Sequence, residues 1–478
     1  MDRYLLAEKL KAIVGPSNVL WEDYDLRLYE YDGSIDKARP GAVVFPTTTA
    51  QAAEVVRFCA AEKLPCTARG AGTGLSGGAI PLAAGVLLIF SRMDQILEVD
   101  VENLRAVVEP GVVNLHLSQA IASTGLQYIP DPSSQKACTI GGNVGENSGG
   151  PHTLLYGVTT NHVSGLEFIT SDGEVIELGG KALDPPGYDV TGLIVGSEGT
   201  FGVVTGATVR LSPIAEAVKT MLAIFDRVED ASAAVSGVIA AGIVPSAIEM
   251  MDHLSIQAVE AAVHAGYPTD AGAVLLIEID SLVEGIDEQA EAIGTVCTEN
   301  HAREIRVAKT AKERNLLWLG RKGAFGAMGR VSPDFYTMDG CVPRDKLPII
   351  LERLDEISRR YGIRIANVFH AGDGNLHPLV LFDSEVPGEE EKVREMGYDI
   401  LSACAEVGGA LTGEHGIGFE KREMMCLTFN DDDLDWMHLV KQTMDPAGLF
   451  NPGKIFPTPG KCWHAQPSRV GRVAVVGW

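Results

Sequence analysis

Cysteine is scarce in this chain of 478 residues, which contains eight and no C-x-x-C pair. An iron–sulfur cluster needs closely spaced thiolates, so the polypeptide carries no such electron relay of its own. Sparse, unpaired spacing is typical of a reducing compartment, and we expect reduced thiols with structural roles in a cytoplasm. These residues are Cys59, Cys66, Cys138, Cys297, Cys341, Cys404, Cys426 and Cys462.

Long apolar runs are also lacking. No stretch reaches the roughly 18 apolar residues that a membrane-spanning helix requires. Near the start, Leu5, Leu6, Leu10 and Ile13 recur at helical spacing with charged residues between them, which the apolar core of a signal peptide does not tolerate. We therefore expect a surface helix there, and a soluble protein of the cytoplasm that is at most peripheral to the inner membrane.

Basic residues are outnumbered. The chain has 39 basic and 64 acidic side chains, a formal net charge of −25. This charge repels polyphosphate backbones and anionic lipid surfaces, so we expect no nucleic-acid partner. The same charge repels an anionic substrate at long range. A site for an acid must therefore supply local positive charge of its own.

The length and the 46% of hydrophobic residues allow more than one buried core, so two or three domains are expected. Residues 43–45, 49–62 and 66–68 read as a strand, a Thr-capped helix and a second strand, which together form a β-α-β unit. Short strands and glycine-dense loops follow to about residue 213. From residue 214, longer amphipathic helices alternate with strands, which predicts an α+β second domain.

Three glycine-rich clusters lie in the first half. Directly after the second strand, residues 69–78 read RGAGTGLSGG. Glycines let successive backbone N–H groups approach an anion and hydroxyls add donors, so a pyrophosphate fits this run. A tight structural turn is the alternative, because the run lacks the Lys-Ser/Thr of a P-loop. Further clusters at residues 139–150 and 196–202 favour the binding interpretation, since turns alone hardly explain three such loops in one domain.

The order of these clusters is specific. Residues 46–48 (PTT) precede a helix, the 69–78 run follows, and Pro130-Asp131-Pro132 leads to the two later clusters. This arrangement, over about residues 40–213, resembles the FAD-binding domain of the vanillyl-alcohol-oxidase superfamily. The resemblance implies that the first loop wraps the FAD pyrophosphate and that the later clusters line the rest of the flavin. The residues expected to bind FAD are Arg69, Gly70, Ala71, Gly72, Thr73, Gly74, Ser76, Gly77, Pro130, Asp131, Gly141, Gly142, Asn143, Asn147, Ser148, Gly149, Glu198, Gly199, Gly202 and Asn451.

The mode of flavin attachment is also predicted. Some members of the superfamily hold the flavin covalently through a histidine in or beside the first loop. No histidine occurs between residues 43 and 115 here. We therefore expect non-covalent, dissociable FAD.

Histidines cluster with a carboxylate in the second half. Residues 369–377 read FHAGDGNLH, so His370 and His377 flank a turn-forming Gly-Asp-Gly that can aim both rings at one point. Residues 412–418, TGEHGIG, add Glu414 and His415 between glycines. Two histidines and a carboxylate are a standard ligand set for a divalent transition metal, with open positions left for substrate.

This cluster has other interpretations. The histidines could be satisfied structural residues, the ligand types also suit a redox-active non-haem iron, and a metal hydrolase without flavin is a third possibility. With a flavin present, a redox metal is unnecessary. A Lewis-acid ion, Zn or Mn, is then the simpler expectation.

The second half carries its own resemblance. Residues 317–322 (LWLGRK), 330–334 (RVSPD) and 451–454 (NPGK) are similar to the FAD-linked 2-hydroxy-acid dehydrogenases. These include D-lactate dehydrogenases, D-2-hydroxyglutarate dehydrogenases and the flavin-bearing D subunit of bacterial glycolate oxidase. The resemblance covers nearly the whole chain. It implies that His370, His377 and Glu414 hold the metal and that His415 is the catalytic base.

The resemblance also implies the architecture. We expect an α+β fold, with a two-lobed FAD-binding domain of PCMH type followed by an α+β substrate or cap domain that has an antiparallel sheet. A C-terminal segment would return to the flavin domain. The expected boundaries are residues 1–37 for an N-terminal helical arm, 38–213 for the FAD-binding domain, 214–410 for the cap domain and 411–478 for the returning segment.

These features predict FAD-dependent oxidation of a small 2-hydroxy acid, of the D-lactate or glycolate class, to the 2-oxo acid. The metal would lower the pKa of the substrate hydroxyl, His415 would take the proton, and the C2 hydrogen would leave as hydride to flavin N5. Arg321 is the candidate to bind the substrate carboxylate, because a planar guanidinium suits it, with Lys322 and Arg330 as competitors.

The sequence leaves several substrates and partners open. Thr337 and Leu379 stand where polar side chains for a second carboxylate would be expected, which favours a short monocarboxylate. The alternatives are a D-2-hydroxyglutarate dehydrogenase, a D-lactate dehydrogenase that acts as a single chain, or a non-catalytic flavin-binding component of an oxidase complex. Electrons would leave to an external acceptor or an iron–sulfur partner subunit, and we expect a homodimer or hetero-oligomer.

Overall fold

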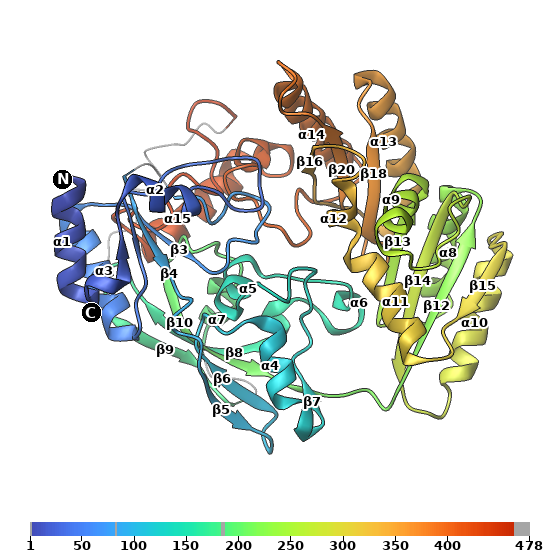
Figure 1. Ribbon diagram of the computed structural model, residues 1–478, viewed down its shortest axis with the longest axis horizontal. Coiled ribbons are helices and arrows are strands. Elements are labelled where there is room, and N and C mark those ends of the chain that lie inside the picture. Colours follow the sequence, from blue (N-terminus) through green and yellow to red (C-terminus); the bar gives the residue numbers. More distant parts are fainter. Residues whose placement is uncertain (1, 82–83, 183–186, 463–478) are drawn as a thin grey trace. The chain divides into compact units, whose positions relative to one another are not determined.

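The computed structural model describes residues 2–81, 84–182 and 187–462. The chain forms two compact units, shown in sequence colours in Figure 1. Unit 1 comprises Met1–Ser148, Val158–Pro213 and His415–Trp478, and unit 2 comprises Gly149–Gly157 and Ile214–Glu414. Among the described residues, no helix combines the length and the apolar character needed to cross a membrane.

One sheet of unit 1 contains the β-α-β unit that the sequence predicts. Its strand order is β1-β2-β4-β3, and β2 and β3 each pair in parallel with β4. The helix α3 begins where the Thr48 hydroxyl accepts a hydrogen bond from the backbone N–H of Gln51. Both α1 and α3 bury apolar side chains against this sheet. The bounds are α1 Arg3–Val14, β1 Val19–Leu20, α2 Asp23–Leu26, β2 Ala42–Val44, α3 Thr49–Glu62, β3 Cys66–Arg69 and β4 Val86–Ile89.

A second sheet of unit 1 is antiparallel, with the order β5-β6-β10-β8-β9. The cluster at residues 139–150, expected as a loop, contains the short helix α5, because the Thr139 hydroxyl accepts from the N–H of Gly142 and starts a helical turn. The bounds are β5 Ile96–Asp100, β6 Arg105–Val108, α4 Asn114–Ile121, β7 Leu126–Gln127, α5 Ile140–Glu146, β8 Val163–Ile169, β9 Val175–Gly179, α7 Val190–Ile194, β10 Val203–Arg210, β11 Ser212–Pro213 and α15 Asp431–Met444.

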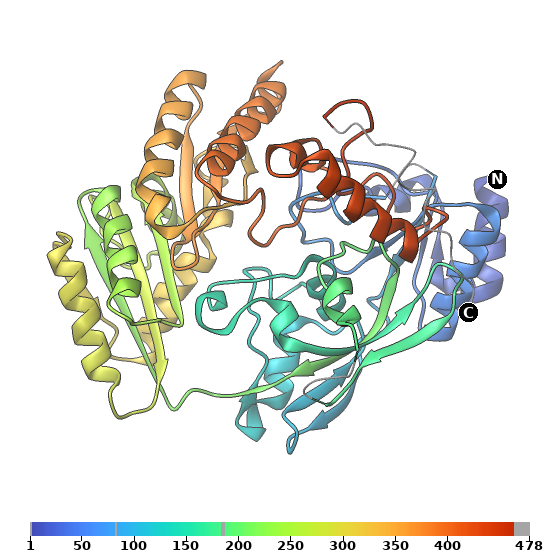
Figure 2. The same cartoon turned by 180° about the vertical axis from the view of Figure 1, so that it is seen from behind.

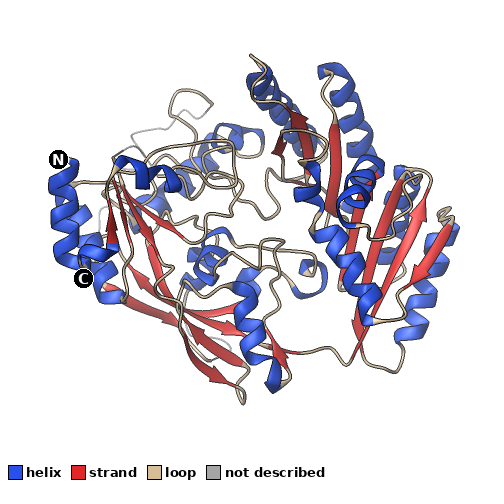
Figure 3. Cartoon of the chain, viewed as in Figure 1, coloured by secondary structure: helices blue, strands red, loops and turns tan. Residues whose placement is uncertain are grey.

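Unit 2 is built on one antiparallel sheet, drawn as red strands in Figure 3. Its main path is β15-β12-β14-β13-β18-β19-β17, and β20 joins β18 to β16. The strands are β12 Ala217–Phe225, β13 Ala247–Asp252, β14 Ala273–Ser281, β15 Glu304–Val307, β16 Asp334–Thr337, β17 Gly340–Cys341, β18 Ile365–His370, β19 Asn375–Leu376 and β20 Pro378–Phe382. This is the antiparallel sheet that the sequence predicts for the second domain.

Helices cover both faces of this sheet, so its central strands are buried almost continuously rather than on alternate residues. The helices α9, α11 and α12 pack on one face, where Leu222, Leu276 and Val368 form a core with Trp318. Figure 2 shows the molecule from behind, with the helices on the other face of this sheet toward the viewer. The helix bounds are α6 Thr153–Tyr156, α8 Val228–Ala240, α9 His253–Val263, α10 Ile286–Glu299, α11 Ala311–Lys322, α12 Ala324–Met328, α13 Leu347–Tyr361 and α14 Glu389–Glu406.

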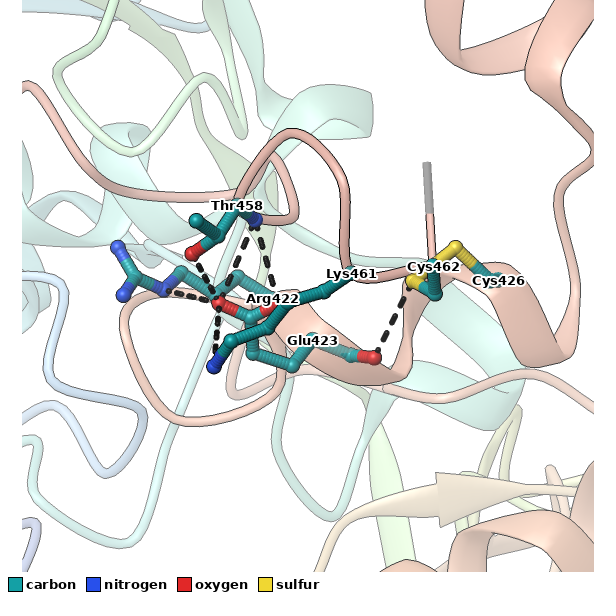
Figure 4. The surroundings of a disulfide bond; sticks show 6 residues. All are labelled: Arg422, Glu423, Cys426, Thr458, Lys461 and Cys462. Atoms are coloured by element: carbon teal, nitrogen blue, oxygen red, sulfur yellow. Dashed lines mark hydrogen bonds and ion pairs between the residues drawn. A yellow bond between two sulfur atoms is a disulfide. The ribbon is translucent and has the colours of Figure 1, made fainter. Parts of the chain in front are cut away.

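The structure corrects one expectation about the thiols. Cys426 and Cys462 form a disulfide with their Cα atoms 6.0 Å apart, so the prediction that all eight cysteines stay reduced is wrong for this pair. As Figure 4 shows, the segment before Cys462 returns to Glu423, whose carboxylate accepts from the N–H and hydroxyl of Thr458. Separation by 36 residues hides this pairing in the sequence. Residues 463–478 lie outside the described residues.

Candidate functional site

The three glycine clusters meet within unit 1. The N–H groups of Gly196 and Glu198 donate to the carbonyls of Val144 and Gly145, at 2.8 Å each, which joins the second cluster to the third. A Cβ atom on Gly70 would lie 2.4 Å from Thr139 Oγ1, so the first cluster touches the second. Clusters that are separated by many residues in the sequence therefore form one site.

The C-terminal segment closes on these clusters. The amide nitrogen of Asn451 donates to the carbonyls of Gly78 (2.9 Å) and Glu198 (2.7 Å). Lys454 Nζ donates to the carbonyls of Gly77 (2.7 Å) and Ile80 (2.6 Å). Residues 451–454 thus hold the first and third clusters together.

The residues present fit a bound FAD. Loop residues 71–75 are partly exposed, and the Cβ directions of Gly145 and Gly199 are open to 4 Å or more. Ser76 Oγ and Glu146 Oε2 are buried without a hydrogen-bond partner among the described residues, so a dinucleotide could supply their partners. Burial and the neighbouring carboxylate of Glu198 raise the pKa of Glu146 well above its ordinary value.

Three other residues predicted to bind the flavin, Gly202, Arg69 and Gly149, have different surroundings. Gly202 is explained by packing, because a Cβ atom there would lie 2.2 Å from the Phe168 ring. Arg69 is buried and donates to the carbonyl of Tyr31 at 2.6 Å, and burial lowers its pKa. Gly149 belongs to unit 2 by its contacts, where a Cβ atom would lie 2.8 Å from Glu414 Oε2.

In unit 2 a tight hairpin brings the two predicted histidine ligands together. His370 ends β18 and pairs with Asn375 of β19, so the chain reverses through residues 371–374, where Gly374 has a φ of +80°. His377 follows β19 directly. The two imidazole rings lie 5.1 Å apart between centroids, nearly perpendicular. The Gly-Asp-Gly turn therefore places both rings at one point, as the sequence predicts.

Glu414 reaches the same point from a distant segment. Its Oε1 lies 3.0 Å from His370 Nε2 and 3.3 Å from His377 Nε2. Buried Asp339 anchors the segment, since its carboxylate accepts from the Thr412 hydroxyl and from the backbone N–H groups of Gly413 and Glu414. Asp339 is a residue that the sequence patterns do not single out.

These three side chains fit a divalent metal. His370, His377 and Glu414 each offer one ligand atom, and the three atoms lie within 4.8 Å of one another. Burial alone would lower the pKa of His370, but the carboxylates of Glu249 and Glu414 raise it well above its ordinary value. Two imidazoles and a carboxylate at these distances form a donor set that suits zinc or manganese.

Arg321 lies in the same unit, on α11, and is 1% exposed, so it is not a surface helix charge. Its Nη2 lies 2.6 Å from Glu249 Oε2. Its Nε has no hydrogen-bond partner among the described residues, so the guanidinium keeps donor capacity for a carboxylate. Of its two competitors, Lys322 is half-buried with its Nζ 5.6 Å from the centroid of the Trp318 ring, and Arg330 is exposed.

Glu249 is the second site residue that the sequence did not reveal. It sits on β13 directly across from His370 on β18, and both of its oxygens lie within 2.9 Å of His370 Nδ1. The available signal in the sequence was an acidic residue between the apolar residues Ile248 and Met250 of a strand.

The structure also places His415, the predicted base, and Thr337 and Leu379, the residues predicted to limit the size of the substrate. His415 is half-buried, follows Glu414 in the chain and is the first residue of its segment of unit 1. Thr337 and Leu379 are cross-strand partners on β16 and β20, and both are buried.

Comparisons with known proteins agree with both units. The family described as "FAD binding domain" matches residues 40–179, and "FAD linked oxidases, C-terminal domain" matches residues 214–455. The glycolate oxidase subunit GlcD of Escherichia coli K12 is 48% identical, over 97% of this chain and 93% of that protein. GlcD of Bacillus subtilis is 40% identical, over 94% and 96%. A D-lactate dehydrogenase of Anaerostipes hadrus is 32% identical, over 94% and 97%.

Solved structures support the fold. A 4-ethylphenol oxidase from Gulosibacter chungangensis aligns with a TM-score of 0.79 at 20% identity, over 95% of this chain and 98% of that one. A p-cresol methylhydroxylase aligns with a TM-score of 0.80 at 18% identity, over 95% and 97%. At such identities the likeness shows the fold alone, and it confirms the α+β architecture of PCMH type that the sequence predicts.

Proposed function

This chain belongs to the FAD-linked oxidases, and from this premise we propose that it oxidises a small 2-hydroxy acid to the 2-oxo acid. The substrate class is that of glycolate and D-lactate, which the names of its relatives carry. The observation that supports this most is the convergence of His370, His377 and Glu414 in the unit that also buries Arg321.

Two bound groups complete the chemistry. Non-covalent FAD, when bound to the glycine clusters of unit 1, supplies the acceptor for a hydride. A divalent ion held by His370, His377 and Glu414 supplies a Lewis acid that favours ionisation of a hydroxyl.

The chain's own residues supply charge and a base. Arg321 binds the substrate carboxylate through guanidinium donors, which answers the need for local positive charge in a protein of net charge −25. A ring nitrogen of His415 accepts the hydroxyl proton, because imidazole titrates near neutrality. The electrons then leave to an external acceptor or to an iron–sulfur partner subunit.

Anaerobic titration of the purified protein tests the function. Glycolate or D-lactate should bleach the absorption of bound flavin, whereas L-lactate and D-2-hydroxyglutarate should bleach it slowly or not at all. A dicarboxylate that bleaches fastest would instead support the 2-hydroxyglutarate alternative. A flavin that no 2-hydroxy acid reduces would support the non-catalytic alternative.

Metal removal tests the Lewis acid separately. Dialysis against a chelator should abolish reduction by substrate while dithionite still reduces the flavin, and Zn²⁺ or Mn²⁺ should restore the activity. Full activity after the metal has been stripped would contradict the role of His370, His377 and Glu414.

A further inference from the structure

We infer that Glu249 is a positioning residue for His370, and that Arg321 holds the Glu249 carboxylate in place. The inference rests on the proposed metal site. It adds a buried relay, Arg321 to Glu249 to His370, behind the ligand that ends β18.

The first step is backbone register. β13 and β18 pair antiparallel, with Glu249 opposite His370. Side chains of directly opposed residues lie on the same face of a sheet. Glu249 therefore meets the imidazole because of the sheet, although 121 residues separate the two in sequence.

The second step is the state of the ring. Glu249 Oε1 and Oε2 lie 2.8 and 2.9 Å from His370 Nδ1. A carboxylate only accepts hydrogen bonds, so Nδ1 must carry the proton. When a cation replaces the proton on Nε2, this atom, which lies 3.0 Å from Glu414 Oε1, would supply its lone pair to the cation while Nδ1 keeps its proton. The ring therefore presents its metal-binding nitrogen to the other ligands.

The third step is charge. The Glu249 side chain is fully buried, and a buried carboxylate without a partner is strongly destabilising. Arg321, at 1% side-chain exposure, places Nη2 2.6 Å from Glu249 Oε2. The ion pair with Arg321 therefore holds the Glu249 carboxylate facing Nδ1 of His370.

Three variants test the relay by metal affinity rather than turnover. Glu249→Gln keeps the shape and one acceptor but removes the charge. Glu249→Asp keeps the charge on a shorter arm. Glu278→Gln is the matched control, since Glu278 is another buried carboxylate of the same sheet, 3.3 Å from a different histidine, His152.

The measurement is calorimetric titration of the metal-stripped, flavin-bound protein with Zn²⁺, alongside thermal melts of the metal-free forms. Loss of a carboxylate behind a histidine ligand typically weakens metal binding about 10- to 100-fold. We expect this loss for Glu249→Gln, an intermediate affinity for Glu249→Asp, and a Kd within about twofold of the wild type for Glu278→Gln.

Each result decides the matter. Equal Zn²⁺ affinity of Glu249→Gln and the wild type overturns the relay, and so does an equal loss in Glu278→Gln. Should Glu249→Gln fail to fold, Glu249→Asp decides, because wild-type affinity there also overturns the relay. If the wild-type protein binds no Zn²⁺, the proposed metal site is overturned together with the relay. If the wild type and Glu249→Gln each bind one ion with equal affinity, only the relay is overturned.

Discussion

Lys454 is a charged side chain in the interior of unit 1. It is 3% exposed, and Nζ donates to the backbone carbonyls of Gly77, Gly78 and Ile80. Burial lowers its pKa from 10.5 to about 8, although three nearby carboxylates, led by Asp32, act in the opposite direction. Because its pKa differs between the folded and the unfolded chain, Lys454 should make the free energy of unfolding depend on pH.

This pH dependence has a definite direction. Between pH 8 and 10.5 the unfolded chain holds a proton on Lys454 that the folded chain releases, so the free energy of unfolding rises with pH. The rise is at most about 1.4 kcal/mol per pH unit. In thermal melts of the flavin-free protein, the melting temperature of the wild type should therefore rise relative to that of Lys454→Met between pH 8 and 10.5. A constant difference between the two melting temperatures would contradict the prediction.

His415 carries the proposed proton transfer. A general base contributes about 10²- to 10⁴-fold to a rate, so His415→Ala should lower kcat by that factor while the bound flavin, measured by its absorption, stays at the wild-type level. His116→Ala, at an exposed position on α4, is the control and should keep full activity. A His415→Ala enzyme that retains most of its turnover would remove this residue from the mechanism.

At the scale of segments, the proposed metal site depends on the loop at residues 412–414, which carries Glu414. It delivers Glu414 because Asp339 accepts its backbone N–H groups, and it approaches the β18–β19 hairpin at Gly413. A Cβ atom on Gly413 would lie 2.3 Å from the side chain of Asn375, which is itself buried. The close approach admits no larger residue.

Gly413→Ala should therefore displace the loop. We expect a loss of about 1–3 kcal/mol in stability from overpacking and a weaker Zn²⁺ affinity, measured by thermal melts and by titration. Gly294→Ala is the control, because the nearest atom to a Cβ there is 3.7 Å away and the residue lies inside α10. That variant should bind Zn²⁺ normally; equal behaviour of the two variants would mean that the Asn375 contact is unimportant.

Across the complete chain, the covalent link between Cys426 and Cys462 ties the end of the described chain back to unit 1. Closing a loop over a separation of 36 residues stabilises a fold by roughly 3–4 kcal/mol in the chain-entropy account. Denatured protein should titrate six thiols without reductant and eight with it. Eight thiols without reductant would mean that the bond does not form, and Cys426→Ser should make the melting temperature insensitive to reductant.

Much of the fold was predictable because its signals are local. The helix α3 runs over Thr49–Glu62 as the sequence predicts, since a Thr cap, an apolar stripe and flanking strands all lie within one window. The hairpin that gathers His370 and His377 is also local, because its turn residues stand between them. Glu414 could be proposed from its residue type and its glycine-rich surroundings, but no spacing rule shows that it meets His370 and His377 across such a separation.

Order and chemistry of the motifs were thus readable from the residues: glycine clusters for a diphosphate, and histidines with a carboxylate for a cation. Folding decided which distant groups became neighbours. Glu249 faces His370 through strand register, Asp339 anchors Glu414 through a loop, and Cys462 meets Cys426 through the returning tail. Such pairings depend on long-range contacts whose free energy comes from the packed core, and no short stretch of sequence encodes them.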